Sequence, residues 1–306
     1  MSTVWCRILL ALALGSAFSF ACAQAQKIAS TARDSHNPLA RRYRDGEPIT
    51  YAMTGVNRGH LTTARYTARA TGAAQRDASG AFVEKFAWSG LVVDGKAVPL
   101  PADLTNWRET LSLSPQVALT VPDLSKVPVA LIGPVTDLLT FYADLQLAAR
   151  QEGLSKAGDH VYFKHGTPNS WADGQYFVLA EDSVDFDVTL KELNREKHRA
   201  TVIVRHVPPA SPQVKLPAEW MRPPVADTGN NWVQVAKQGE TKYVADVGKE
   251  TFAVEMTVDT RSGKLIAAKM ENPVEVLERE CTDAGLAHCG EPVRYEILRQ
   301  ITIAAE

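Results

Sequence analysis

The fold is decided by residues 250–273, which read ETFAVEMTVDTRSGKLIAAKMENP. In residues 251–259 every second side chain is apolar, and the side chains between them are polar or small. Residues 259–263 are of types that form turns, and the chain then returns to an apolar pattern. Alternation with a period of two is typical of a strand with one buried and one solvated face. This stretch therefore predicts an antiparallel hairpin.

The same alternation occurs in other parts of the chain. We expect further strands at residues 62–71, 82–92, 184–191, 198–207 and 294–303. Turn signals stand between several of them, including DASG at residues 77–80 and Asp94-Gly95, a pair typical of two-residue hairpins. The strand over residues 82–92 is predicted to place Val92 on the same buried face as Phe82 and Trp88.

One segment has helical periodicity instead. Its apolar stripe is predicted to contain Val135, Leu138, Leu139, Tyr142, Leu145 and Ala149. We place Asp137, Thr140 and Asp144 on the opposite, polar side. The helix is expected to begin at residues 133–134, where glycine precedes proline, and to end near residue 150. The apolar stripe needs a partner, and the dry face of a sheet is the natural one.

The predicted fold class is therefore mainly β (α+β), a large curved antiparallel sheet or open half-barrel packed around one principal helix. We divide the chain into a signal peptide (1–25), a flexible leader (26–47) and a single β-rich domain (48–306). The domain contains an irregular proline-rich segment at 207–229, which could also be a linker between two halves. Since strands of the same character lie on both sides of it, we favour one domain.

The first residues indicate export. Arg7 precedes an apolar run that is too short for a membrane span, and the cleavage motifs Ala21-Cys22-Ala23 and Ala23-Gln24-Ala25 follow it. We expect cleavage and a periplasmic or secreted mature chain without a transmembrane segment. An uncleaved anchor and lipid attachment at Cys22 are the alternatives.

Composition excludes several classes of protein. Of 306 residues, 45% are hydrophobic and 22% charged, as in ordinary globular proteins rather than in disordered or collagen-like chains. With 33 basic and 35 acidic residues, the formal net charge is −2, so nothing indicates a nucleic-acid partner. We expect no cofactor and no bound metal, because no motif for either occurs.

After the signal region only Cys281 and Cys289 remain of the four cysteines. In an oxidising compartment such an isolated pair predicts a disulfide. A redox pair, or a metal site that also uses His288, is the alternative, but the spacing is not that of a CxxC motif and a closed zinc site needs more ligands.

Two charged residues stand on faces that are otherwise apolar. Glu84 shares its face with Phe82, Phe86 and Trp88, and Arg299 shares its face with Tyr295 and several isoleucines. Because burial of an unpaired charge is costly, the two could pair with each other, hold the polar end of a ligand, or be turned to solvent by a bulge.

A curved sheet with a helix on its concave face can enclose an apolar ligand. The residues predicted to line such a site are Tyr66, Glu84, Phe86, Trp88, Leu138, Tyr142, Phe252 and Arg299. We therefore predict a non-enzymatic binding or carrier protein for a lipid-like, apolar or amphipathic ligand. Aromatic residues in this pattern could also simply fill a core.

The alternatives are an exported hydrolase and an envelope protein-interaction scaffold. The candidate catalytic residues are Asp159, His160, His165, Asp173 and His206, which could supply a general base. An odd spacing places His160 and His165 on opposite faces of a strand, and a turn with an aromatic residue also explains the segment. His206 could equally be a hydrogen-bonded core histidine.

The layout of an exported chain with many antiparallel strands and one helix resembles the open β-barrels of periplasmic lipoprotein carriers, the LolA-like group. The hairpin over residues 250–273 carries this resemblance. The resemblance implies a carrier function by analogy, and it assigns no site residue.

Overall fold

The structure is a computed structural model, and it describes residues 37–164, 176–180, 185–207, 218–221 and 230–306. Its strands are β1 (Pro48–Arg58), β2 (Thr63–Arg76), β3 (Phe82–Val93), β4 (Lys96–Ala97), β5 (Glu109–Leu111), β6 (His160–Phe163), β7 (Tyr176–Ala180), β8 (Asp185–Asn194), β9 (Arg199–Val207), β10 (Asn230–Lys237), β11 (Tyr243–Glu250), β12 (Phe252–Asp259), β13 (Leu265–Cys281) and β14 (Val293–Ala305). Its helices are α2 (Val129–Arg150) and the 3-10 helices η1 (Ala102–Asn106), η2 (Leu124–Lys126) and η3 (Glu219–Met221). Within the described residues, no helix has the length and apolarity needed to cross a membrane.

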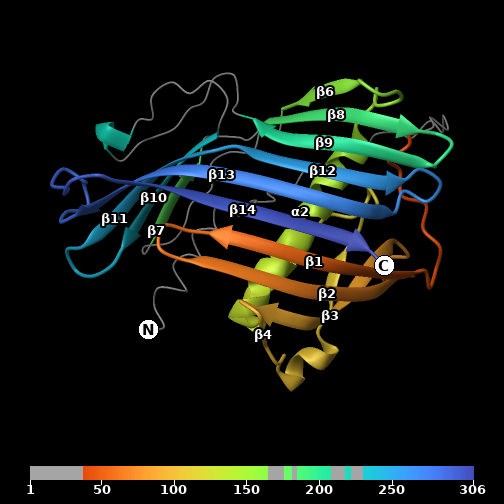
Figure 1. Cartoon of the computed structure of the whole chain (residues 1–306), viewed down its shortest axis with the longest axis horizontal. Helices are drawn as coiled ribbons and strands as arrows, with labels where there is room; N and C mark the ends of the chain where they lie inside the picture. Colours follow the sequence, from red (N-terminus) through yellow and green to blue (C-terminus); the bar gives the residue numbers. More distant parts are fainter. Residues whose placement is uncertain (1–36, 165–175, 181–184, 208–217, 222–229) are drawn as a thin grey trace.

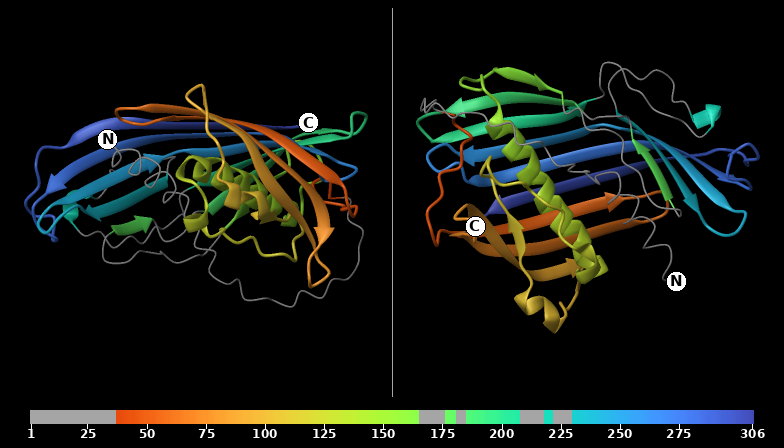
Figure 2. Two further views of the ribbon diagram at one scale, coloured as in Figure 1. Left: turned by 90° about the horizontal axis from the view of Figure 1, so that it is seen from below. Right: turned by 180° about the vertical axis from the view of Figure 1, so that it is seen from behind.

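The strands form one 14-stranded sheet whose pairs are antiparallel, and this confirms the predicted fold class. Its main path runs β4-β3-β2-β1-β14-β13-β12-β9-β8-β6, while β5 pairs with β3, and β11, β10 and β7 continue from β13 (Figure 1). The sheet curves around α2, which crosses its concave side (Figure 2). The long strands β13 and β14 extend beyond the region that α2 crosses, toward β10 and β11.

The alternation of apolar residues produces this curved face directly. In β12, the predicted hairpin strand, Phe252, Val254, Met256 and Val258 are buried, and their neighbours are half-buried. They pair across the sheet with inward-facing residues of β9, with Val254 opposite Val204 and Met256 opposite Val202. The turn at residues 259–263 returns the chain into β13, with the amide of Gly263 donating to the carbonyl of Asp259. The expected hairpin is confirmed.

Strand β3 departs from strict alternation. The sequence pattern places Val92 on the face of Trp88, but Leu91 is the buried residue and Val92 is only half-buried. The register between β2 and β3 shifts next to Gly90, which has a φ of +61°. A β-bulge here adds a residue and reverses the faces of the strand beyond it. The prediction for Val92 is therefore wrong.

Helix α2 is longer and more deeply buried than its sequence pattern predicts. It begins at Val129, so Pro134 lies inside the helix instead of at its start. The three side chains predicted on its polar side, Asp137, Thr140 and Asp144, are buried. Because these polar side chains are buried, they need partners inside the protein.

Residues 37–47, which we call the N-terminal strap, are the described part of the expected flexible leader (26–47), and they pack against the rest of the fold. Leu39 belongs to the core and the Asn37 amide donates to the carbonyl of Ala149 at the end of α2, at 2.7 Å. The strap passes close to the β12–β13 turn: a Cβ at Gly263 would lie 2.2 Å from the carbonyl oxygen of Ala40. Glycine is required there, and its φ of +67° is also one that other residues avoid.

The described residues contain a second, smaller core at the far end of β13. It consists of Met221, Val235, Ala245, Val247, Cys281 and Leu286. Ala245 lies opposite Arg279, whereas the residues of β13 that face α2, such as Ala268 and Met270, have even numbers. The second core therefore packs on the convex face of the same sheet. Most of the proline-rich segment 207–229 lies outside the described residues.

Candidate functional site

The eight residues predicted to line a ligand site all lie in the interior between α2 and the sheet. The aromatic and aliphatic members belong to the main hydrophobic core, and none of the eight has more than 9% of its surface exposed. Tyr51, Phe86 and Tyr142 form a cluster of ring contacts, with centroids 5.8 to 6.5 Å apart. The chain's own side chains thus surround these residues.

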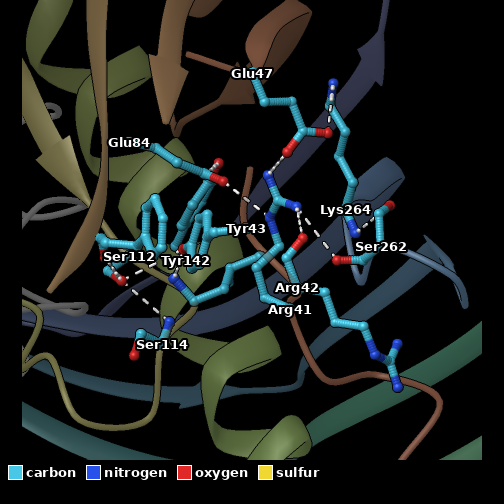
Figure 3. Close-up of polar contacts among 12 residues, drawn as sticks. Arg41, Arg42, Tyr43, Glu47, Glu84, Ser112, Ser114, Tyr142, Ser262 and Lys264 are labelled. Carbon is cyan, nitrogen blue, oxygen red and sulfur yellow. Dashed lines mark hydrogen bonds and ion pairs between the residues drawn. The ribbon is translucent and has the colours of Figure 1, made fainter. Parts of the chain in front are cut away.

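Glu84 lies at the centre of one polar cluster (Figure 3). Its side chain accepts a hydrogen bond from Tyr142 on α2 and forms an ion pair with Arg41 of the N-terminal strap, 3.1 Å between Nε and Oε1. Arg41 also binds Glu47 at 2.6 Å and the carbonyl of Ser262 at 3.2 Å. Burial raises the pKa of Glu84, and the charge of Arg41 opposes that shift.

Arg299 lies at the centre of a second polar cluster. Its guanidinium forms an ion pair with Asp137 on α2, and the hydroxyl of Tyr66 donates to the same carboxylate at 2.5 Å. Glu84 and Arg299 are therefore neither paired with each other nor turned to solvent, as two of the sequence hypotheses had them. Each has found a partner that the strand pattern could not reveal, one in the strap and one on the helix.

Arg299 belongs to a row of polar residues that crosses the concave face. Asn57 of β1 is directly opposite Arg299 of β14, which is opposite Asn272 of β13. The row reaches His206 of β9, which lies opposite Phe252. We call Asn57, Arg299, Asn272 and His206 the polar belt, and all four are buried.

Helix α2 supplies the two acidic partners of the polar belt. Asp137 binds Arg299, and both carboxylate oxygens of Asp144 lie 3.2 Å from Nε2 of His206. The two aspartates are seven residues apart, so they lie on the same side of the helix, two turns apart. His206 is thus a hydrogen-bonded core histidine, which is one of the two roles expected for it from the sequence.

Asn57 differs from the other members of the polar belt. Only 8% of its surface is exposed, and no donor among the described residues reaches its buried Oδ1 atom. Asn272, in contrast, donates to the Glu250 carboxylate and to the carbonyl of Thr251, both at 3.2 Å. Neither asparagine was singled out from the sequence, because their position beside Arg299 depends on strand register.

Another buried carboxyl lies near Trp88. Oε2 of Glu109 accepts a hydrogen bond from the indole of Trp88 at 2.9 Å, while its buried Oε1 atom has no partner in the part of the chain that the structure describes. Burial raises the pKa of Glu109 well above its usual range, and the bond from Trp88 only partly opposes this. Burial therefore favours the neutral carboxylic acid form of Glu109.

The described catalytic candidates do not come together. Asp159 accepts bonds from the amides of Ser155 and Lys156 and so stabilises a turn. His160 is exposed and lies 2.7 Å from Asp187, whose neighbours Phe186 and Val188 point into the core, so this pair is on the convex side. His206 is on the concave side. His165 and Asp173 lie outside the described residues.

The predicted cysteine pair is seen: the sulfur atoms of Cys281 and Cys289 are 2.01 Å apart. His288 lies beside Asp283 at 3.4 Å rather than on the sulfurs. In the described part of the chain, no three His, Cys, Asp or Glu side chains are grouped as metal ligands.

Comparison with known proteins adds no family to this description. No family model matches the sequence, and the search of curated proteins finds no match either. The resemblance to lipoprotein carriers stays a prediction, and the functional case rests on the concave face itself.

Proposed function

We propose that this chain is an exported, non-enzymatic binding or carrier protein for an apolar or amphipathic ligand. The observation that supports this is a large antiparallel sheet whose long strands β13 and β14 continue beyond helix α2 (Figure 2), with apolar side chains on the face that α2 crosses. Contact between apolar surface and water is unfavourable, so an apolar ligand that covers this face would be bound.

The part of the concave face beyond the polar belt is the proposed binding surface. Val274 and Val276 of β13 and Tyr295 and Ile297 of β14 share the face of Arg299, and we call these four residues the distal strip. The eight residues that the sequence predicts to line a ligand site lie in the packed core, so a ligand among them would have to displace α2. In the distal strip, Val274 and Val276 are buried, whereas Tyr295 and Ile297 are half-buried and leave apolar surface for a ligand.

The polar belt gives this surface a defined border. An amphipathic molecule with its chain along the distal strip would place its head beside Asn57 and Arg299. The arrangement matches the usual composition of ligand sites, which are largely apolar with a few fixed polar groups.

The proposal is tested by native mass spectrometry of the protein purified from its host and by uptake of a fluorescent fatty-acid probe. We expect a co-purifying lipid and saturable probe binding. The variant Ile297→Lys should reduce probe binding at least tenfold, because it introduces a charge on the distal strip. The control Glu296→Lys changes the adjacent, exposed residue, whose side chain points to the other face.

The absence of any co-purifying lipid together with no probe uptake would refute the proposed function. Equal binding by wild type, Ile297→Lys and Glu296→Lys would place the ligand elsewhere and refute the assignment to the distal strip. An expected periplasmic or secreted location is tested separately, by fractionating the host and sequencing the mature N-terminus.

A further inference from the structure

The buried oxygen of Asn57 indicates that the polar belt lacks one hydrogen-bond donor. Among the described residues no donor reaches this atom, although only 8% of the surface of Asn57 is exposed. A buried acceptor without a donor is costly, and native proteins rarely keep one unless water or a ligand supplies the bond. The position of Asn57, at the end of the polar belt and on the last residues of β1, leaves it next to the proposed ligand surface.

The charges beside Asn57 are already matched. Arg299 pairs with Asp137, and Asp137 accepts a second hydrogen bond from Tyr66. Glu250 accepts from Asn272. An anionic head group would have to compete with Asp137 for Arg299, and it would bring a negative charge close to that carboxylate. A cationic head would in turn be repelled by Arg299.

The geometry points to an amphipathic ligand with an uncharged, hydrogen-bond-donating head, such as the hydroxyl groups of a monoacylglycerol, bound at Asn57. This inference rests on the proposed function and specifies its ligand class. A hydroxyl donates to Oδ1 of Asn57 and can also accept from neighbouring donors, so it completes the polar belt without adding charge. An arginine on an apolar face would by itself suggest a free fatty acid as the ligand. The unpaired acceptor of Asn57 favours an uncharged head group instead.

Three amphiphiles with the same ten-carbon chain test this: 1-decanoylglycerol, decanoate and decylamine, titrated below their micelle concentrations by calorimetry. We expect wild type to bind decanoylglycerol about tenfold more tightly than either charged compound, since one satisfied hydrogen bond in a buried site corresponds to about that factor. Asn57→Leu should lose this preference, and its affinity for decanoate should stay within about twofold of wild type.

Gln300→Leu is the matched control, because it removes an amide of the same kind from the neighbouring position on the convex face. Asn57→Ala repeats the test with a smaller side chain, and circular dichroism checks that each variant is folded. A preference for decanoate or decylamine, or a decanoylglycerol preference that survives both Asn57 variants, overturns the inference and leaves the proposed function standing. Failure of all three compounds to bind wild type overturns both.

Discussion

At the scale of single residues, ionisable groups in the interior of this protein form pairs with residues that are distant in the sequence. Arg299 pairs with Asp137, and Glu84 pairs with Arg41. Such pairs replace the hydration that the charges lose on folding, and removal of one partner leaves the other charge buried alone. The pairs therefore determine how α2 and the strap are positioned on the sheet.

The Arg299–Asp137 pair is tested by a double-mutant cycle. We expect Arg299→Met to lower the free energy of unfolding by about 3–5 kcal/mol, because it leaves the Asp137 carboxylate without its counter-charge. The double variant Arg299→Met/Asp137→Leu should be more stable than Arg299→Met alone, since no bare charge remains. Urea unfolding curves measure both. Strictly additive losses would show that the two side chains are not coupled.

Glu109 gives a prediction with a definite pH dependence. Its pKa is raised in the folded protein, so the wild type takes up a proton on folding and its stability falls as pH rises from the unfolded pKa, about 4.3, toward the folded pKa. Glu109→Gln keeps an acceptor for Trp88 and does not titrate. Its free energy of unfolding should match that of wild type near pH 4.5 and exceed it at pH 7.5, by an amount that grows at up to about 1.4 kcal/mol per pH unit.

Differential scanning calorimetry at several pH values measures this difference. Exposed Glu296→Gln serves as the control and should follow wild type throughout. A difference between Glu109→Gln and wild type that is the same at all pH values would mean that Glu109 does not carry the shifted titration.

At the scale of elements, periodicity predicted the long strands β2, β3, β8, β9, β12, β13 and β14 but not β1, β10 or β11, and it predicted the helix only in part. The pattern at residues 252–258 was sufficient because a strand in a one-sided sheet alternates wherever it is regular. It failed at Gly90, where a bulge shifts the register. The acidic residues of α2 were misplaced because a sequence pattern cannot show that sheet and strap enclose the helix. For the same reason the polar belt, which depends on pairing across strands, had no local signal.

The N-terminal strap is expected to be an integral element of the fold. Arg41→Ala removes the ion pairs with Glu84 and Glu47, and we expect a loss of about 3–5 kcal/mol in the free energy of unfolding. The neighbouring Arg42→Ala is the matched control: Arg42 bonds only to exposed backbone carbonyls of the β12–β13 turn, so its loss should cost less than about 1 kcal/mol.

Hydrogen exchange locates this effect. In Arg41→Ala the amides of the strap and of the turn at residues 259–263 should exchange faster, while those of β6 and β8 keep their protection. Equal stability of the two arginine variants would contradict an anchoring role for Arg41.

At the scale of the whole molecule, several buried carboxyls titrate in the same direction. Burial raises the pKa of Glu84, Glu109 and Glu250, and burial together with the charge of Glu278 raises the pKa of Asp246 to about 7. Because the pKa of each of these groups is raised in the folded protein, the free energy of unfolding falls as the group ionises. The exposed aspartates with lowered pKa values, such as Asp77, act in the opposite sense and only at lower pH.

The protein should therefore be most stable in mildly acidic solution. Below about pH 4 the exposed aspartates lose their stabilising hydrogen bonds, and between about pH 4 and 7 the buried carboxyls lower the stability as pH rises. Melting temperatures measured from pH 3.5 to 8 should pass through a maximum near pH 4 to 5. Asp246→Asn should flatten the slope between pH 5 and 7. A melting temperature that rises steadily to pH 8 would contradict this reading of the interior.

One consequence follows from the two cores lying on opposite faces of a single sheet. Strand β13 contributes Met270 to the larger core and Cys281 to the smaller one, so the same strand is part of both cores. Because both cores contain this 17-residue strand, a change in the twist of one end of the strand reorients its other end. Binding of a ligand on one face would thereby affect residues on the opposite face, about 36 Å along the strand for the eleven residues from Met270 to Cys281 at ~3.3 Å each.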